Sequence, residues 1–316
     1  MKKVVSVSLG SSKRNHTVQV ELLGENFSIS RIGTDGDINK AIKMIQQLDG
    51  NVDAIGLGGI DVYLYACHNR YVIKDGMRML KAAKVTPVVD GSGLKNTLER
   101  QAVAYLAEQG LLTRGSKVLM VSAMDRFGMA EAMDNIGCQL ILGDAMFALG
   151  IPFPIYSLEK LQRIASKIMP IISRLPFTMI YPTGSKQDKQ SRLRATKFAS
   201  YYHHAEVIAG DYHFIHKYLP EKLNGQMIIT NTITAADVEL LMERGAAMLV
   251  TTTPEFQGRT FGTNVMEAVF LALLGKRWDE ATPEDYAALL QQLNWQPKII
   301  KLKKEINAQV QESPAP

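Results

Sequence analysis

Short apolar runs alternate with helical patterns through the middle of the chain, and this alternation constrains the fold more than any other feature. Six of these runs are predicted strands, at 118–121, 139–142, 178–181, 206–209, 227–230 and 248–251. Predicted helices separate most of them, at 128–136, 158–173, 192–203 and 235–244. Strands buried on both faces are apolar throughout, so the pattern predicts a parallel sheet covered by helices on both sides.

The first third of the chain predicts a smaller arrangement of the same kind. Strands are expected at 4–9, 18–22, 27–32, 52–57 and 87–89, and helices at 37–48, 75–84 and 96–109. Asp37 or Asp35 is a suitable N-cap for the first of these helices. The fold class is therefore α/β: an N-terminal mixed α/β domain (1–110), followed by a doubly wound, Rossmann-like parallel-sheet domain (111–262). Helices at 263–274 and 283–293 and a possible strand at 299–302 complete a C-terminal part (263–316), whose helices are expected to pack at the domain junction and whose tail frays.

Composition narrows the class of protein. The 316 residues suffice for two domains, and the net charge of +5 is too mild, without a reading motif, to favour nucleic acid as a partner. Two cysteines fit reduced thiols, and no metal is expected. The apolar run after Lys3 ends by Gly10 and alternates with serines, which favours a strand over a secretory signal. We expect a cytoplasmic protein with a small-molecule substrate and no membrane partner. The sequence leaves the oligomeric state open.

One Gly-rich turn carries the strongest functional signal. Val89-Asp90-Gly91-Ser92-Gly93-Leu94 joins a short strand to a long helix, and the strand at 118–121 follows. This order resembles the quinate/shikimate dehydrogenase family, in which a Thr-Asp-Gly-x-Gly-(apolar) segment lies at the junction of two domains. The resemblance covers roughly residues 85–275 in the order of elements. It implies an oxidoreductase that transfers a hydride between NAD(P) and a small hydroxylated carboxylic acid, with Asp90 as a catalytic, substrate-binding carboxylate.

The catalytic lysine of that family lies in a segment that this chain lacks. Lys95 is a possible substitute as the base, because it follows Asp90 by only five residues; the alternative is a solvated lysine on the first turn of a helix.

The cofactor loop departs from the family as well. In Ser122-Ala123-Met124-Asp125-Arg126-Phe127-Gly128, Ser122 and Asp125 stand where glycines are expected, and Gly128 alone is kept. Asp125 would repel a pyrophosphate, or it is an N-cap of the following helix. Asp144 ends the second strand of the domain, where an acid binds ribose hydroxyls and favours NAD over NADP; the alternative is that Gly143-Asp144 is a turn.

Ligands of open parallel sheets bind beyond the carboxyl ends of the strands, so the polar residues at these ends are candidates for substrate binding. They are Asp61, Asn96, Lys186 in a cation-rich loop, and Thr252, Arg259 and Asn264 in the segment 251–264. Thr263 is the expected N-cap of the helix that ends this segment.

His213 follows another predicted strand end, two residues after Asp211. It is a candidate general acid or base with Asp211 as its partner. A structural histidine is the alternative, and metal binding with His216 is the weakest reading.

Two function hypotheses follow. The first is an NAD(P)-dependent dehydrogenase, with NAD favoured. The second keeps the Rossmann-like scaffold without the dinucleotide and makes the chain a non-redox protein or enzyme that binds a small anion. The discriminating feature is whether the loop 122–128 can accept a pyrophosphate.

Overall fold

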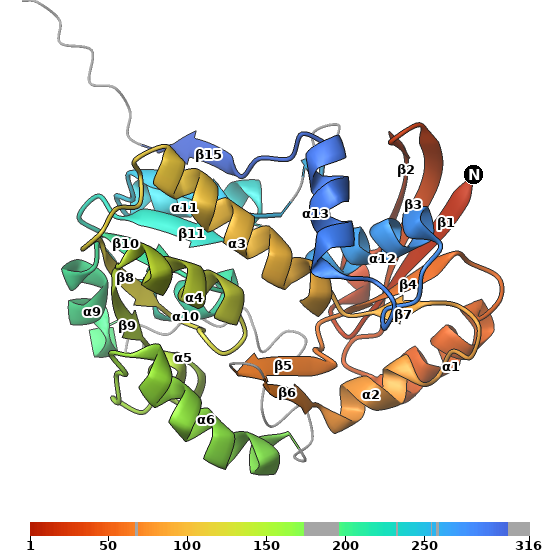
Figure 1. Ribbon diagram of the computed structural model, residues 1–316, viewed down its shortest axis with the longest axis horizontal. Coiled ribbons are helices and arrows are strands. Elements are labelled where there is room, and N and C mark those ends of the chain that lie inside the picture. The colour runs from red at the N-terminus through yellow and green to blue at the C-terminus, as the bar shows by residue number, and fades with distance from the viewer. Residues whose placement is uncertain (67–68, 174–195, 232, 254, 257–258, 303–316) are drawn as a thin grey trace, which may run out of the picture.

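Two mainly parallel sheets flanked by helices make up the chain in the computed structural model (Figure 1). The residues it describes are 1–66, 69–173, 196–231, 233–253, 255–256 and 259–302. The predicted α/β fold class is confirmed. None of the helices in these ranges combines the length and the apolar content that crossing a bilayer requires.

The first sheet has the strand order β2-β3-β1-β4-β7, and only β2 runs antiparallel to its neighbour. Its strands are β1 (Lys2–Ser8), β2 (His16–Leu22), β3 (Glu25–Gly33), β4 (Ala54–Gly58) and β7 (Val88–Val89). All five residues of β4 are buried, as expected for a strand covered on both faces. Helix α1 (Ile38–Leu48) leads into β4, and Asp37 caps it by accepting a hydrogen bond from the backbone N–H of Lys40, as predicted. Helix α2 (Lys74–Leu80) precedes β7.

The second sheet has the order β15-β12-β11-β10-β8-β9, and only β15 is antiparallel. Its strands are β8 (Lys117–Met120), β9 (Gln139–Leu142), β10 (Val207–Ala209), β11 (Met227–Thr230), β12 (Met248–Thr251) and β15 (Lys298–Lys301). The chain leaves β8 through α4 (Phe127–Ile136) to reach β9 on one side, and β10 then lies on the other side of β8. This reversal is a switch point, so a crevice for a ligand is expected between the carboxyl ends of β8 and β10.

The remaining helices cover the second sheet or extend from it. They are α5 (Asp144–Leu149), α6 (Leu158–Ile172), α9 (Ala199–His204), α10 (Tyr212–Tyr218) and α11 (Ala235–Glu243). Two hairpins, β5–β6 (Tyr63–Ala66 and Asn69–Val72) and β13–β14 (Glu255–Phe256 and Arg259–Thr260), were not predicted. Neither was α5. The predicted strand at 178–181 lies outside the described residues.

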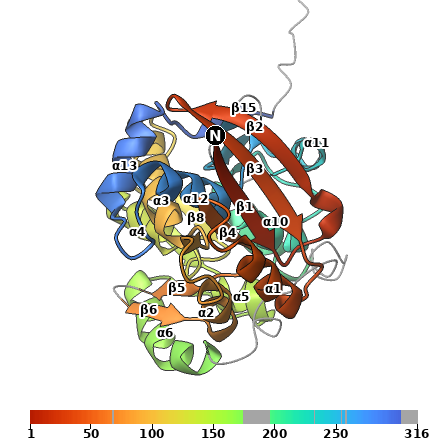
Figure 2. The same ribbon diagram turned by 90° about the vertical axis from the view of Figure 1, so that its right-hand side faces the viewer.

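Helices α3 (Ser92–Glu108), α12 (Thr263–Leu274) and α13 (Pro283–Gln292) hold the two sheets together (Figure 2). Helix α3 starts at the end of β7 and packs along α4. Helix α12 lies against β1, β4 and α3, and its buried face (Val265–Ala272) belongs to the core of the first sheet. The chain then returns through α13 to pair β15 with β12. The predicted division of the chain at 110 and 262 stays a prediction.

Close approach of α12 explains the glycines of the turn 90–93. Gly91 has a φ of 95°, and a Cβ added there would lie 2.7 Å from the backbone nitrogen of Asn264. A Cβ on Gly93 would lie 2.4 Å from Oε1 of Glu267, a buried carboxyl that accepts a hydrogen bond from the Tyr286 hydroxyl at 2.8 Å. The glycine spacing therefore serves contact between the start of α3 and the start of α12.

Gly91→Ala tests this packing. The substitution should lower the free energy of unfolding by about 2–5 kcal/mol, because it combines a left-handed backbone with an overlap against the backbone of α12. Gly110→Ala is the matched control, since Gly110 has a φ of 68° but open space around it, and it should cost only about 1–2 kcal/mol. Denaturant unfolding of both variants measures the difference. Equal losses would contradict the role assigned to α12.

Candidate functional site

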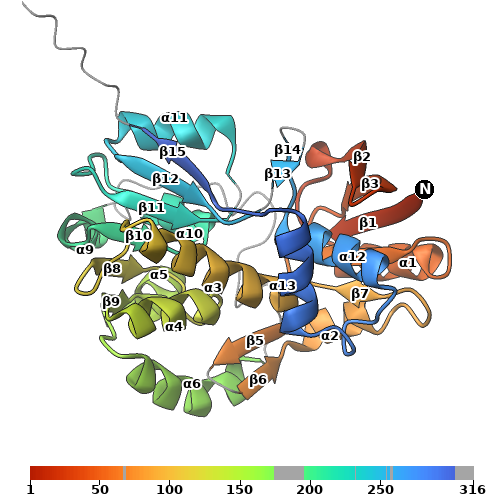
Figure 3. The ribbon, with the colours of Figure 1, turned by 45° about the horizontal axis from the view of Figure 1, so that its top comes forward.

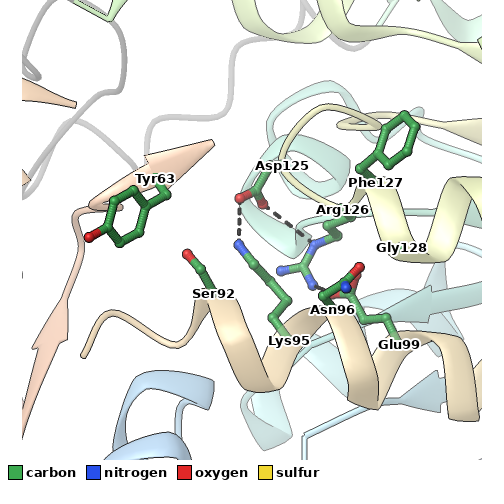
Figure 4. Close-up of a pocket in the computed structure, with 9 residues that line it drawn as sticks. All are labelled: Tyr63, Ser92, Lys95, Asn96, Glu99, Asp125, Arg126, Phe127 and Gly128. Atoms are coloured by element: carbon green, nitrogen blue, oxygen red, sulfur yellow. Dashed lines mark hydrogen bonds and ion pairs between the residues drawn. The ribbon is translucent and has the colours of Figure 1, made fainter. Parts of the chain in front are cut away.

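The candidate site lies where the first turns of α3 face the loop that follows β8 (Figure 4). Helix α3 passes behind α13 and runs from the first sheet toward the second, as Figure 3 shows. A small hollow is lined there by Tyr63, Ser92, Lys95, Asn96, Glu99, Asp125, Arg126, Phe127 and Gly128. It therefore draws on β5, α3, the loop between β8 and α4, and the first two residues of α4.

Lys95 connects the two halves of the site. Its Nζ lies 2.6 Å from Oδ1 of Asp125, on the loop after β8, and 3.7 Å from Oδ1 of Asp61, just past β4. The side chains of Lys95, Asp61 and Asp125 are 15%, 26% and 22% exposed, so ligands from solvent can reach all three. Of the predicted residues, the structure brings these three together as one charged group.

The three charges shift one another's protonation. Burial raises the pKa of Asp61 to about 7; Lys95 opposes this rise and Asp125 adds to it. Burial alone would lower the pKa of Lys95, but the carboxylates of Asp125 and Asp61 raise it above its ordinary value. The two carboxylates therefore favour the charged form of Lys95, which opposes the predicted role of Lys95 as a base. Asp61 is the group that can take up or release a proton near neutral pH.

A buried ion network lies behind the hollow. The guanidinium of Arg126 forms an ion pair with Glu99 of α3 and donates to Oδ2 of Asp211, at the end of β10, at 3.2 Å. Burial raises the pKa of Glu99, an effect that Arg126 opposes. Burial would also raise the pKa of Asp211, but His213, Arg126 and the backbone N–H of His213 bring it below its ordinary value. The network joins α3 to both sides of the switch-point crevice.

Side chains of the protein close the crevice further. The Ser122 hydroxyl accepts a hydrogen bond from the backbone N–H of Asp211 at 3.0 Å, and the amide of Asn231 donates to Oδ2 of Asp211 at 3.2 Å. Asn96 of α3 packs on Gly128, where an added Cβ would lie 2.3 Å from its Oδ1. Gly128 thus allows α3 to approach α4.

Asp144 also contacts the loop that follows β8. Its Oδ1 accepts the backbone N–H of Met124 at 2.8 Å, and burial raises its pKa to about 6. It is the first residue of α5, so the turn expected at Gly143-Asp144 is wrong. The N-cap reading of Asp125 is also wrong, because Arg126 is the N-cap residue of α4, and it makes no capping bond through its side chain.

Asp90 holds the turn that starts α3. Its Oδ2 accepts hydrogen bonds from the backbone N–H of Val62 at 2.6 Å and from the Ser92 hydroxyl at 2.8 Å, and its Oδ1 accepts the Ser92 N–H at 3.0 Å. It thereby fixes the link between β4 and β5, which includes Asp61. The structure gives Asp90 a positioning role.

The other predicted residues lie apart from the hollow or outside the description. Asn264 lies in the first turn of α12, and its side-chain amide donates to the Ser6 hydroxyl at 2.9 Å. Thr252 is buried. The expected cap at Thr263 is wrong, because Gly262 precedes α12 and no side chain caps it. His213 lies at the start of α10. Lys186 and the side chain of Arg259 lie outside the described residues.

Sequence reasoning missed Glu99 and Tyr63 as parts of the site, and Arg126, although part of the loop 122–128, was not among the predicted site residues. The spacing of Lys95 and Glu99, four residues apart on a predicted helix, places both on one helix face and was a readable signal for the first of these. In the described part of the chain, no group of three or more His, Cys, Asp or Glu side chains is placed to hold a metal ion.

The comparisons with known proteins identify a family. A model described as "Domain of unknown function (DUF8754)" matches residues 93–302. The chain belongs to this family. A second model, described as "Domain of unknown function (DUF8753)", matches residues 3–90. The two matches of this DUF8754 protein thus meet at the turn of Asp90, immediately before α3. No curated protein matches the sequence.

Solved structures give remote likenesses to the DUF8754 chain. An ABC transporter solute-binding protein from Burkholderia multivorans is 11% identical, with a TM-score of 0.39, over 87% of this chain and 92% of that one. A glucose-galactose binding protein from Geobacillus stearothermophilus is 8% identical, with a TM-score of 0.39, over 96% and 99% of the two chains. A glutamate dehydrogenase mutant is 11% identical, with a TM-score of 0.39, over 85% of this chain and 63% of that one.

The charge coupling around Asp61 is testable by carbon-13 NMR of its side-chain carboxyl. The resonance should titrate near pH 7 in the unmodified protein. Lys95→Met should raise the pKa of Asp61, because it removes the neighbouring cation, whereas Asp125→Asn should lower it by removing a like charge. Shifts in the opposite directions, or a titration near pH 4 in the unmodified protein, would contradict the arrangement.

The buried network makes a prediction for stability. Arg126→Met should lower the free energy of unfolding by about 3–5 kcal/mol, because Glu99 and Asp211 lose their buried cation. Arg100→Met, which breaks the more exposed pair of Arg100 with Glu131, should cost about 1 kcal/mol or less. Urea unfolding of the two variants checks the contrast. A loss for Arg126→Met no larger than the control's would show that the network contributes little.

Proposed function

We propose that this DUF8754 protein binds a small polar molecule between its two sheets and carries out proton transfer on it through Asp61, with Lys95 as the neighbouring cation and without a dinucleotide. One observation carries the proposal: each residue predicted to bind the cofactor has a partner within the protein. Ser122 accepts a hydrogen bond from the backbone of Asp211, Asp125 accepts one from Lys95, and Asp144 accepts one from the N–H of Met124. Gly128 packs against Asn96.

A pyrophosphate at this loop would have to displace these partners and lie beside carboxylates. Backbone N–H groups that would bind phosphate oxygens at the start of α4 need an approach free of negative charge. Asp125 is part of this loop, and Asp144 and Asp211 are hydrogen-bonded to the loop residues Met124 and Ser122. The repulsion and the lost hydrogen bonds both oppose a dinucleotide.

Asp61 and Lys95 suit acid–base chemistry. A carboxyl with a pKa of about 7 can accept a proton from a ligand hydroxyl or return it at neutral pH. The ammonium group of Lys95, 3.7 Å away, can stabilise negative charge that develops on a ligand oxygen. Asp90 keeps the Asp61 segment in place through the Val62 N–H.

Ligand class follows from the charges that face the hollow. The hollow is lined by the carboxyls of Glu99 and Asp125 and by the cations of Lys95 and Arg126, and the carboxyl of Asp61 adjoins it. Carboxylates are acceptors, so a ligand with hydroxyl or amine donors suits Asp61 and Asp125. Tyr63 bounds the hollow on one side, but its ring is 7% exposed and packs on Trp278 with 5.5 Å between the ring centroids, so the polar groups determine the ligand class.

A dehydrogenase of the quinate/shikimate type is the second candidate. The order of the parallel strands, β9-β8-β10-β11-β12, with the loop after β8 at the switch point, favours it. In that case Asp125 and Asp144 would have to release their partners when the dinucleotide binds.

Calorimetric titration with NAD⁺, NADH, NADP⁺ and NADPH separates the two candidates. The proposal expects no binding at micromolar concentrations, because the loop is occupied and negatively charged. Micromolar binding of any of the four would overturn it in favour of the dehydrogenase.

A thermal-shift screen of polyols, sugar acids and amino sugars tests the Asp61–Lys95 pair directly. A compound that stabilises the unmodified protein should bind Asp61→Asn and Lys95→Met at least about tenfold more weakly, as expected when a charged hydrogen-bonding partner is lost. Glu239→Gln, which removes an exposed carboxylate on α11, should leave its affinity unchanged. Undiminished affinity in both site variants would place the ligand elsewhere.

A further inference from the structure

We propose a second binding site, for an oxyanion, in the loop that follows β1. The loop runs from Leu9 to Asn15 and includes the short 3₁₀ helix η1 (Ser12–Arg14). Arg31, on the neighbouring strand β3, reaches over it, and Arg14 approaches from within it. The chemical group that fits is a carboxylate or a phosphate, which two guanidinium groups can hold together.

The two guanidinium groups lie close together on one side of the loop. A Cβ added to Gly10 would lie 2.8 Å from NH2 of Arg31 and 3.6 Å from NH2 of Arg14, so both guanidinium groups converge above this glycine. In the described ranges, the acceptors of Arg31 are neutral: the Ser11 carbonyl and the Ser8 hydroxyl, each at 3.1 Å. Within the described residues, no carboxylate forms an ion pair with either guanidinium.

The like charges oppose each other in the structure. Burial lowers the pKa of Arg31, and the charge of Arg14 lowers it further. Asp35 is the carboxylate that offsets this effect, but its Oδ1 accepts the backbone N–H of Ser12 at 2.7 Å. Two cations held together against their repulsion gain free energy when an anion binds between them.

The backbone of the loop that carries Arg14 is well fixed, and Arg31 is held against it by its two hydrogen bonds. The Asn15 side chain accepts the N–H of Gly33 at 2.6 Å, and the backbone of Gly33 packs so closely on Ser11 that an added Cβ would lie 2.5 Å from its carbonyl oxygen. The backbone N–H of Asp35, a residue with a φ of 55°, donates a hydrogen bond to the carbonyl of Gly10 at 3.1 Å. Fixed donors lose little conformational entropy when they bind a ligand.

The position of the loop connects it with the proposed function. Leu9 N–H donates to the carbonyl of Gly58 at 2.8 Å, and Gly59 lies against Gly10, two residues before Asp61. The arginine pair therefore lies on the same edge of the first sheet as Asp61. If the proposed function holds, the ligand carries an anionic group at the arginine pair, a hydroxyl or amine donor at Asp61 and an oxygen that accepts from Lys95.

The test uses inorganic phosphate and malonate as probes, titrated separately into the full chain by calorimetry. At least one should bind with one-to-one stoichiometry. Arg31→Gln and Arg14→Gln should each weaken that binding by about tenfold or more, the effect expected for loss of a charged hydrogen bond. Preference for phosphate or for malonate tells which anionic group the site takes.

Lys43→Gln is the charge-matched control, because Lys43 is an exposed lysine on α1 and loses the same charge. It should change the affinity less than twofold. Gly10→Ala keeps both arginines but takes the space beside Arg31, so it should weaken binding even if Arg31→Gln fails to fold. Asp61→Asn should retain anion binding, which separates failure of the proposed function from failure of this site. Absence of binding by both probes, or a loss in Lys43→Gln equal to that in Arg14→Gln, would overturn the proposal.

Discussion

The buried guanidinium of Arg126 is the constraint on which the arrangement of this protein depends. Burying a charge is costly unless it is paired and hydrogen-bonded, and Arg126 finds its partners on α3 and at the end of β10. Helix α3 leaves the first sheet, whereas Arg126 and Asp211 follow strands of the second. The need of Arg126 for buried carboxylate partners therefore fixes the position of α3 against the carboxyl ends of β8 and β10.

This requirement also shapes the candidate site. Arg126 is paired with Glu99 and Asp211, so Lys95 is the other cation that lines the hollow. Asp125 and Asp61 both form ion pairs with Lys95. The crevice that a Rossmann-like sheet offers to a cofactor is filled by bonds within the protein, and the accessible chemistry lies at its border with β4. A familiar strand order can thus carry a different function, because the function depends on the side chains at the strand ends.

The sequence predicted the fold better than the site. The strands at 139–142, 227–230 and 248–251 have their predicted bounds, because buried parallel strands form uninterrupted apolar runs. The β5–β6 hairpin was missed, since polar residues interrupt its apolar pattern. Lys95, Asp61 and Asp125 could be named from their places at strand ends, but which of them pair depends on how α3 packs. The glycine spacing at 91 and 93 looked like a family signature, and its contacts with α12, about 170 residues away, are invisible in local sequence.

Amide NMR mapping with NADH tests the central claim, that the protein's own side chains close the switch-point crevice, most directly. In a nitrogen-15-labelled sample with millimolar NADH, the account predicts no specific shifts for the backbone amides of Met124, Arg126 and Asp211, which lie in or beside that crevice. Saturable shifts confined to these amides would show that the crevice opens for a dinucleotide and would contradict the account.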